Sequence, residues 1–120
     1  MSAGKACAQA AHAANQFVLT MQTSMVDRPL WNLYAQWRLS TTGGFGTTIV
    51  LTADLNEIKW VEGLIKNGAS QFEVISGWVH DPTYPVKDGN VMHYIPVDTC
   101  FYVFGDPESC KVLVDVLPLY

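Results

Sequence analysis

The sequence has no run of basic residues and few charged residues of either sign. Its seven lysines and arginines are never adjacent, and eleven acidic residues outnumber them, which gives a formal net charge of −4 at pH 7. Broad, non-specific binding to nucleic acid depends on many contacts between basic side chains and phosphates. The charge balance therefore argues against such binding, although it leaves room for a local basic patch.

Cysteine is scarce as well. The three cysteines are odd in number and show no CxxC spacing, and they lie at Cys7, Cys100 and Cys110. This pattern argues against a disulfide framework or a structural zinc site and fits a reducing compartment. Cys7 lies near a predicted helix start and close to His12. A cysteine nucleophile is thus the functional alternative to a small buried cysteine.

Long apolar runs are missing too. No stretch approaches the roughly 20 apolar residues that a membrane span requires, and the first residues lack the apolar segment of a secretory signal. Of the 120 residues, 49% are hydrophobic and 15% are charged, which is enough apolar material for one buried core. We therefore expect a single domain over residues 1–120 that is soluble and cytoplasmic.

The spacing of apolar residues predicts helices and a small sheet. Each of the predicted helices follows a capping residue, namely Ser2, Asp27, Asp54 and Asp106. The predicted strands are Thr47–Ala53, Gln71–His80 and His93–Gly105. The proline-containing stretch Asp81–Asn90 is predicted to be a loop. Together these elements predict an α/β single-domain layered fold, with a small mixed sheet of three to four strands flanked by about four helices.

The first predicted helix carries a narrow polar stripe among its alanines. The stripe residues recur at spacings of four, three and four, at Lys5, Gln9, His12 and Gln16. Small apolar residues about a quarter turn away would let this helix pack tightly against a sheet. The stripe is then either the solvent-facing side of an amphipathic helix or one wall of a site, and its spacing alone allows both.

The order of residues along this stripe resembles a known family. In MSAGKACAQAAHAA, a Gly-Lys dipeptide leads to Ala-Gln and then to His-Ala along one helix. This order is similar to the N-terminal motif of the type-2 peptidyl-tRNA hydrolases. Trp37 and the stretches TTIVL, VHDP and VLPLY resemble further parts of that family. The resemblance spans nearly the whole chain and is tightest over the first fifteen residues.

The resemblance implies a fold and an activity. Members of the family have an α/β sandwich, are often dimeric, and hydrolyse the ester that joins a peptide to the 3′ end of tRNA without a metal or other cofactor. The resemblance implies catalytic roles for Lys5, His12 and Asp81. It implies substrate contacts for Gln9, Thr83 and Thr99. The expected partners are the acceptor end of peptidyl-tRNA and, in a homodimer, a second copy that covers an open sheet edge.

The sequence also departs from the family. The family's Asp-Ala-Gly loop reads Asp81-Pro82-Thr83-Tyr84-Pro85 here, and an inserted loop is expected around Val86–Met92. Family members carry a strand before the Gly-Lys motif that does not precede Met1 in this sequence. Either the strand is lost, or the sequence begins at an internal start, or it is a fragment. A missing strand would expose sheet edges, so we expect a loop or a partner to cover one of them. These departures favour the alternative that the chain is a catalytically impaired relative acting as a binding or inhibitory protein.

Ester hydrolysis needs an activated water and a stabilised oxyanion. The candidate residues on the stripe and Asp81 would each contribute to one of these requirements or to substrate binding. Lys5, near a helix N-terminus, would supply positive charge to the oxyanion or to a phosphate of the tRNA end. His12 would act as acid and base or would make a structural hydrogen bond. Asp81 would orient Lys5 or the water, unless it serves only as a turn former. Gln9 would position the substrate.

Overall fold

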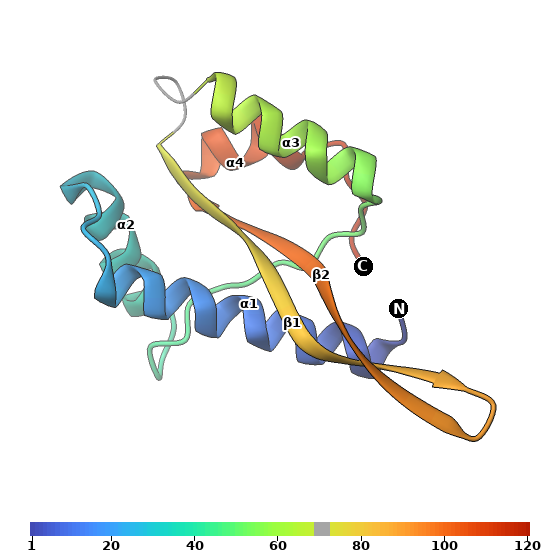
Figure 1. Ribbon diagram of the computed structural model, residues 1–120. Coiled ribbons are helices and arrows are strands. Elements are labelled where there is room, and N and C mark those ends of the chain that lie inside the picture. The colour runs from blue at the N-terminus through green and yellow to red at the C-terminus, as the bar shows by residue number, and fades with distance from the viewer. Residues whose placement is uncertain (69–72) are drawn as a thin grey trace. The chain divides into compact units, whose positions relative to one another are not determined.

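A computed structural model describes residues 1–68 and 73–120, and in this part of the chain it shows helices and one antiparallel hairpin (Figure 1). The helices are α1 (Ala3–Thr23), α2 (Arg28–Leu39), α3 (Leu55–Asn67) and α4 (Pro107–Val114). The strands are β1 (Val74–Asp88) and β2 (Val91–Gly105). The chain is therefore mixed α/β, as predicted. None of the described helices has the length and apolar character that crossing a membrane would require.

The helix starts follow the predicted caps. Side-chain capping hydrogen bonds form at Ser2, Asp54 and Asp106. At α3 the Asp54 carboxylate accepts the Glu57 N–H at 2.8 Å, and the Glu57 carboxylate accepts the Asp54 N–H at 3.0 Å. This reciprocal pair is the predicted capping box. Asp27 stands at the N-cap of α2 without a side-chain capping bond, and Pro29 in the first turn favours the helical start there.

The chain divides into two compact units, each built from two separate stretches. The first unit combines Met1–Leu19 with Gly77–Tyr102, and the second combines Thr20–Ser76 with Val103–Tyr120. All six residues predicted to form the site lie in the first unit. Each unit is described by itself below.

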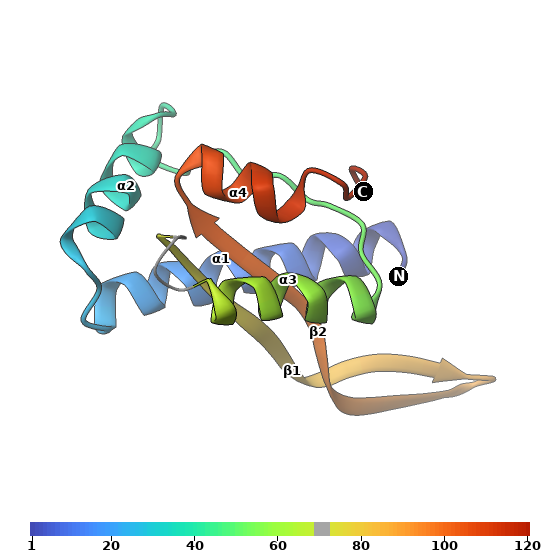
Figure 2. The same ribbon diagram turned by 90° about the horizontal axis from the view of Figure 1, so that it is seen from above.

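In the first unit α1 lies along the hairpin of β1 and β2 (Figures 1 and 2). Side chains alternate between the two faces of a strand. Val79 and Asp81 are accordingly buried, whereas His80 between them is exposed. Apolar packing is provided by Phe17 of α1, whose ring centroid lies 5.8 Å from that of Tyr102. The buried face of β1 therefore carries one carboxylate into the contact with α1.

The predicted loop Asp81–Asn90 is wrong, because β1 continues through it to Asp88 and β2 begins at Val91. The turn between them uses Gly89 with a φ of +59°, a conformation that favours glycine. The prolines of this stretch are tolerated because a two-stranded hairpin consists of edge strands only. The loop expected at Val86–Met92 is the far end of the same hairpin. The start of the predicted strand at Gln71 lies outside the described residues.

The prediction of a mixed sheet with three to four strands is also wrong for the described part of the chain, which holds two antiparallel strands. The stretch Thr47–Ala53 forms only one isolated antiparallel bridge, between Leu51 and Leu119. Ile49 within it is 68% exposed. Its β-branched composition favours a strand, but β-propensity reflects how well a side chain packs on a half-buried sheet. Within residues 1–68 and 73–120 this stretch belongs to no such sheet, so its composition alone does not make it a strand. Among the described residues, the backbone of this stretch pairs only with the end of the chain, and Trp37 Nε1 donates a side-chain hydrogen bond to Thr47 O at 2.7 Å.

The second unit contains α2 to α4 and a row of aromatic rings. Tyr34 is 4% exposed, and its ring centroid lies 5.3 Å from Trp31 and 6.2 Å from Trp37. Trp37 in turn meets Phe104 edge-on at 5.8 Å. Trp31 keeps 44% of its surface exposed. Tyr34 therefore packs in the core of this unit, as its helical spacing with the tryptophans indicates, and Trp31 lies at the margin.

Candidate functional site

The polar stripe of α1 faces the hairpin, so it is not simply the solvent-facing side of the helix. Three residues of the stripe each donate one hydrogen bond to β1: Lys5 Nζ to Pro85 O at 2.8 Å, Gln9 Nε2 to Asp81 Oδ2 at 2.9 Å and Gln16 Nε2 to Trp78 O at 2.8 Å. The partners fall in residue number as the stripe advances, so α1 and β1 run antiparallel. The stripe forms a packed polar wall along the strand.

Asp81 is the centre of this wall. Its residue is 9% exposed, and its Oδ1 accepts the backbone N–H of Thr83 at 2.9 Å while Oδ2 accepts the Gln9 amide. The Gln9 hydrogen bond, the Thr83 N–H and the nearby His12 lower the pKa of Asp81 below its usual value, against the opposing effect of burial. Asp81 is therefore an ionised, oriented carboxylate at neutral pH.

Gln9 links Asp81 to the second strand. Its residue is 4% exposed, and its Oε1 accepts the Thr99 hydroxyl at 2.5 Å. The Cys100 thiol lies 3.6 Å from the backbone oxygen of Gln9, and burial raises the pKa of this thiol. An amide that donates to a carboxylate and accepts from a hydroxyl has a fixed orientation. Gln9 and Thr99 were predicted to contact substrate. In the structure Gln9 is buried against Asp81, and the half-buried Thr99 supports Asp81 only through Gln9.

His12 is the solvent-facing member of the cluster. Its Nε2 lies 4.0 Å from Asp81 Oδ2, and its side chain is 52% exposed compared with 10% for the carboxylate. The imidazole thus has a carboxylate behind it and water in front of it. This arrangement suits a group that exchanges protons with a bound molecule.

Lys5 stands apart from the carboxylate. Its ammonium is bound to Pro85 O and lies 4.9 Å from the centroid of the Tyr84 ring. No ion pair joins it to Asp81 among the described residues. Of the two tasks predicted for Asp81, the orienting of Lys5 is therefore not found. Lys5 and His12 are separated by seven residues, which corresponds to about 10 Å along a helix axis.

The structure thus gathers the predicted residues into two neighbouring groups within the first unit. Thr83, Gln9 and His12 surround Asp81 directly, and Thr99 joins through Gln9. Lys5 belongs with Tyr84 and Pro85. The two contacts of Lys5 were missed because the stretch was assigned to a loop. The Gly89-Asn90 dipeptide, a recognised two-residue hairpin turn, could have revealed the strand.

A second His–Asp pair lies on the opposite, exposed face of the hairpin. His80 Nδ1 is 2.9 Å from Asp98 Oδ1, and the two side chains are 59% and 57% exposed. The alternation of β1 separates His80 from the buried face that carries Asp81. This pair therefore lies outside the cluster and serves as an internal comparison for it.

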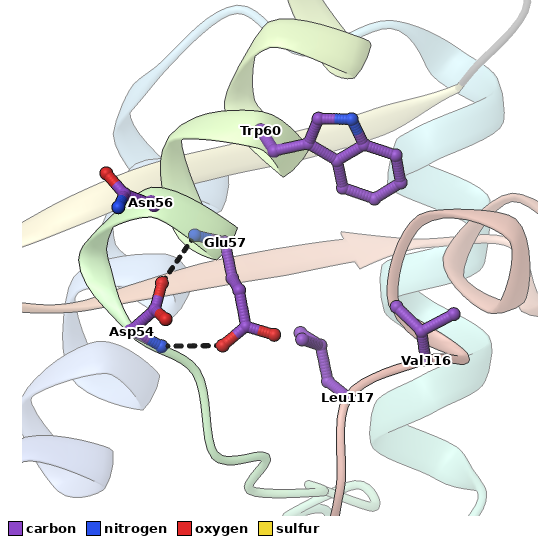
Figure 3. A pocket seen from close by; sticks show the side chains of 6 residues that line it. All are labelled: Asp54, Asn56, Glu57, Trp60, Val116 and Leu117. Atoms are coloured by element: carbon purple, nitrogen blue, oxygen red, sulfur yellow. Dashed lines mark hydrogen bonds between the residues drawn. The ribbon is translucent and has the colours of Figure 1, made fainter.

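The second unit contains an open cavity of about 280 Å³ next to the start of α3 (Figure 3). Its acidic lining residues, Asp54 and Glu57, are engaged with each other's backbone N–H in the capping box. Trp60, Val116 and Leu117 supply the apolar lining. Since its carboxylates already stabilise the helix start, the cavity is a weaker candidate than the cluster around Asp81.

Possible metal ligands do not gather in the described residues. No group of three or more His, Cys, Asp or Glu side chains there is placed to hold a metal ion. The three cysteines are free thiols, and Cys7 is exposed on α1.

Comparisons with models of protein families, with curated proteins and with solved structures found no match for this chain. The resemblance to type-2 peptidyl-tRNA hydrolases consequently rests on the residues of the sequence itself.

Proposed function

We propose that this chain hydrolyses the ester bond of peptidyl-tRNA at the cluster around Asp81. The observation that supports this most strongly is the convergence of residues that the resemblance names from distant parts of the sequence. Gln9 meets Asp81, 72 residues further on, and also meets Thr99, 90 residues further on. His12 reaches the same carboxylate from the solvent side. An accessible imidazole backed by an ionised carboxylate is suited to activating the water that attacks the ester.

In the proposed reaction His12 is the acid and base. In its neutral form it takes a proton from a water molecule that attacks the ester carbonyl, and Asp81 stabilises the imidazolium that results. His12 then returns the proton to the 3′ oxygen of the ribose as the carbon–oxygen bond breaks. The products are tRNA with a free 3′ hydroxyl and the peptide carboxylic acid, which releases its proton to solvent and becomes the carboxylate. Gln9 and Thr83 keep Asp81 ionised and oriented throughout.

We assign Lys5 to the phosphate side of the substrate. Lys5 stands about 10 Å along the α1 axis from His12. Its ammonium is bound to the carbonyl of Pro85, four residues along β1 from the Asp81 that His12 approaches, so we place it away from the ester carbon. The terminal nucleotide of tRNA carries a phosphate next to the ribose that holds the ester. A lysine is a compact cation that suits such a group.

The activity is tested by the release of peptide from an N-acetylated aminoacyl-tRNA. We expect His12→Ala and Asp81→Asn each to lower kcat by about 100-fold or more, the size of a general acid–base contribution. His80→Ala and Asp98→Asn are matched controls, because they remove the same groups from the exposed pair on the other face. Absence of hydrolysis by the unaltered chain, or equal effects in both pairs, would contradict the proposal.

The role of Lys5 is tested with two substrates that share one ester. Lys5→Ala is expected to raise KM for the tRNA substrate by about tenfold, the equivalent of one charged hydrogen bond. The same variant should leave hydrolysis of a peptidyl-adenosine, which has no phosphate, unchanged. Lys87→Ala, at an exposed position of β1, is the control. A loss of kcat on both substrates would instead assign Lys5 to the oxyanion.

One observation favours the second candidate, a binding or inhibitory relative of these enzymes. β2 exposes four large apolar side chains, between 41% and 66% accessible, at Val91, Met92, Tyr94 and Ile95. Exposed apolar patches mark contacts with other proteins. These side chains alternate between the two faces of the strand, with Val91 and Ile95 on one and Met92 and Tyr94 on the other. Sedimentation velocity of the chain and of Tyr94→Glu would show whether a second copy covers the face that carries Met92 and Tyr94. A dimer that dissociates in the variant, together with absence of hydrolysis, would support this candidate over the first.

A further inference from the structure

Tyr84 and Pro85 contact Lys5 at the place where the sequence departs from the family's loop. The Lys5 ammonium lies 4.9 Å from the centroid of the Tyr84 ring and donates to the Pro85 carbonyl at 2.8 Å. The three residues are half-buried, whereas Pro82 and Thr83 before them are exposed. Two adjacent residues of β1 thus enclose one ammonium from two directions.

We propose that Tyr84 and the Pro85 carbonyl hold the Lys5 ammonium in place, which makes Tyr84 a positioning residue for substrate binding. This rests on the proposed function, because it concerns the same site. An ammonium has three donors. The Pro85 oxygen takes one, and the aromatic face attracts the cation from a second side. A donor remains for an anionic group of the substrate.

The local sequence makes this arrangement rigid. A residue that precedes proline is restricted to extended backbone, so Pro85 limits the conformations available to Tyr84. The hydrogen bond from Gln9 to Asp81 fixes the same strand against α1 one helical turn further along. The flexible side chain of Lys5 is therefore bound by a segment of β1 that is restricted by Pro85 and held against α1 by the hydrogen bond between Gln9 and Asp81.

A held ammonium selects substrates by spacing. We call the contacts of Lys5 with Tyr84 and the Pro85 carbonyl the clamp. His12 and Lys5 lie on one helix, so the distance between the reacting group and the cation is set by α1 and by this clamp. A substrate gains from both only if its anionic group stands at that distance from its ester. The clamp thus favours esters that carry a neighbouring phosphate over simple esters.

The chemical reactivity of Lys5 tests the clamp without any substrate. Each lysine is labelled with N-hydroxysuccinimide acetate and its rate is followed by peptide mass spectrometry. Tyr84→Leu removes the aromatic face and is expected to speed labelling of Lys5 by about threefold to tenfold. Tyr84→Phe keeps the face and should match the unaltered chain. Tyr94→Leu makes the same change at a tyrosine of β2 that is 66% exposed and should have no effect on Lys5.

Lys66 is the reference lysine for the labelling rates, because its side chain is 73% exposed and lies in the second unit. An unchanged rate at Lys5 in Tyr84→Leu, a rate in Tyr84→Phe equal to that in Tyr84→Leu, or an equal rise at Lys66 would each overturn the proposal. Thermal melting of the variants separates a local effect from a loss of folding.

Kinetics then test the positioning role. Tyr84→Leu should raise KM for N-acetylated aminoacyl-tRNA by about threefold to tenfold while kcat changes by less than about twofold. Hydrolysis of the phosphate-free ester should stay unchanged. A labelling change without a change in KM overturns the positioning role.

The two proposals fail in distinguishable ways. If the unaltered chain hydrolyses nothing but Lys5 labels as expected, the proposed function fails and the clamp stands. If hydrolysis depends on Lys5 but neither labelling nor KM responds to Tyr84→Leu, the clamp fails and the function stands.

Discussion

At the scale of single residues, Asp81 carries the clearest electrostatic signature in the first unit. The Gln9 amide and the Thr83 N–H hold its pKa below the usual value in the folded chain. The ionised form therefore favours the folded state. This contribution is fully present above the ordinary pKa of about 3.9, and it is lost as the pH falls through the lower pKa of the folded chain.

The acid stability of the chain should consequently depend on Asp81. We expect the urea midpoint of the unaltered chain to fall as the pH drops below about 4, and this fall to be shallower in Asp81→Asn. Asp98→Asn, which alters an exposed carboxylate of the same hairpin, is the control. Identical pH profiles of the urea midpoint for the two variants would contradict the expected contribution of Asp81 to stability in acid.

The identity of the candidate residues could be read from the sequence, but their individual tasks could not. The spacing of Lys5, Gln9 and His12 places them on one helix face whatever packs there. Which of them becomes buried depends on the neighbouring element. Gln9 meets two strands and loses its contact with solvent, whereas His12 keeps half of its surface exposed. No pattern within the helix distinguishes these two outcomes.

At the scale of elements, the helix starts were predicted well because a cap is a local device. Asp54 and Glu57 stand three residues apart, and their reciprocal hydrogen bonds need nothing from the rest of the chain. The backbone hydrogen bonds of a strand, in contrast, cannot be satisfied within the strand itself and need a second segment. Thr47–Ala53 has the composition of a buried strand and forms a single bridge. The hydrogen-bonding partner of a strand is chosen by tertiary structure.

The turn of the hairpin gives a test at this scale. Gly89 has a φ of +59° with nothing within 4 Å of an added Cβ, so Gly89→Ala is expected to cost about 1 kcal/mol of conformational strain. Gly4→Ala, in the first turn of α1 with equal space around it, should leave stability unchanged or raise it by a few tenths of a kcal/mol. Urea denaturation measures both. Equal stability of the two variants would rule out a hairpin turn that depends on Gly89.

At the scale of the whole molecule, the charge balance limits how tRNA could be bound. The net charge is −4, and the lysines in the two stretches that make up the first unit are Lys5 and Lys87. Each phosphate contact to a single strand contributes a salt slope of about 0.7. The single contact assigned to Lys5 therefore predicts that log(kcat/KM) falls with log salt with a slope of about −0.7. Kinetics between about 50 and 200 mM salt measure it. A slope several times steeper would require phosphate contacts beyond the one assigned to Lys5 and would contradict that assignment.

The sequence by itself determined the class of the chain, the starts of its helices and the polar stripe of α1. These features follow from residues a few positions apart, so local hydrogen bonding and periodicity are sufficient to specify them. The tertiary structure decided how many strands pair, that Asp81 lies on a strand, and that its neighbours are Gln9 and His12. It also placed Lys5 against Tyr84 and Pro85. These outcomes depend on groups some 70 to 90 residues apart, and only packing between α1 and the hairpin brings them together.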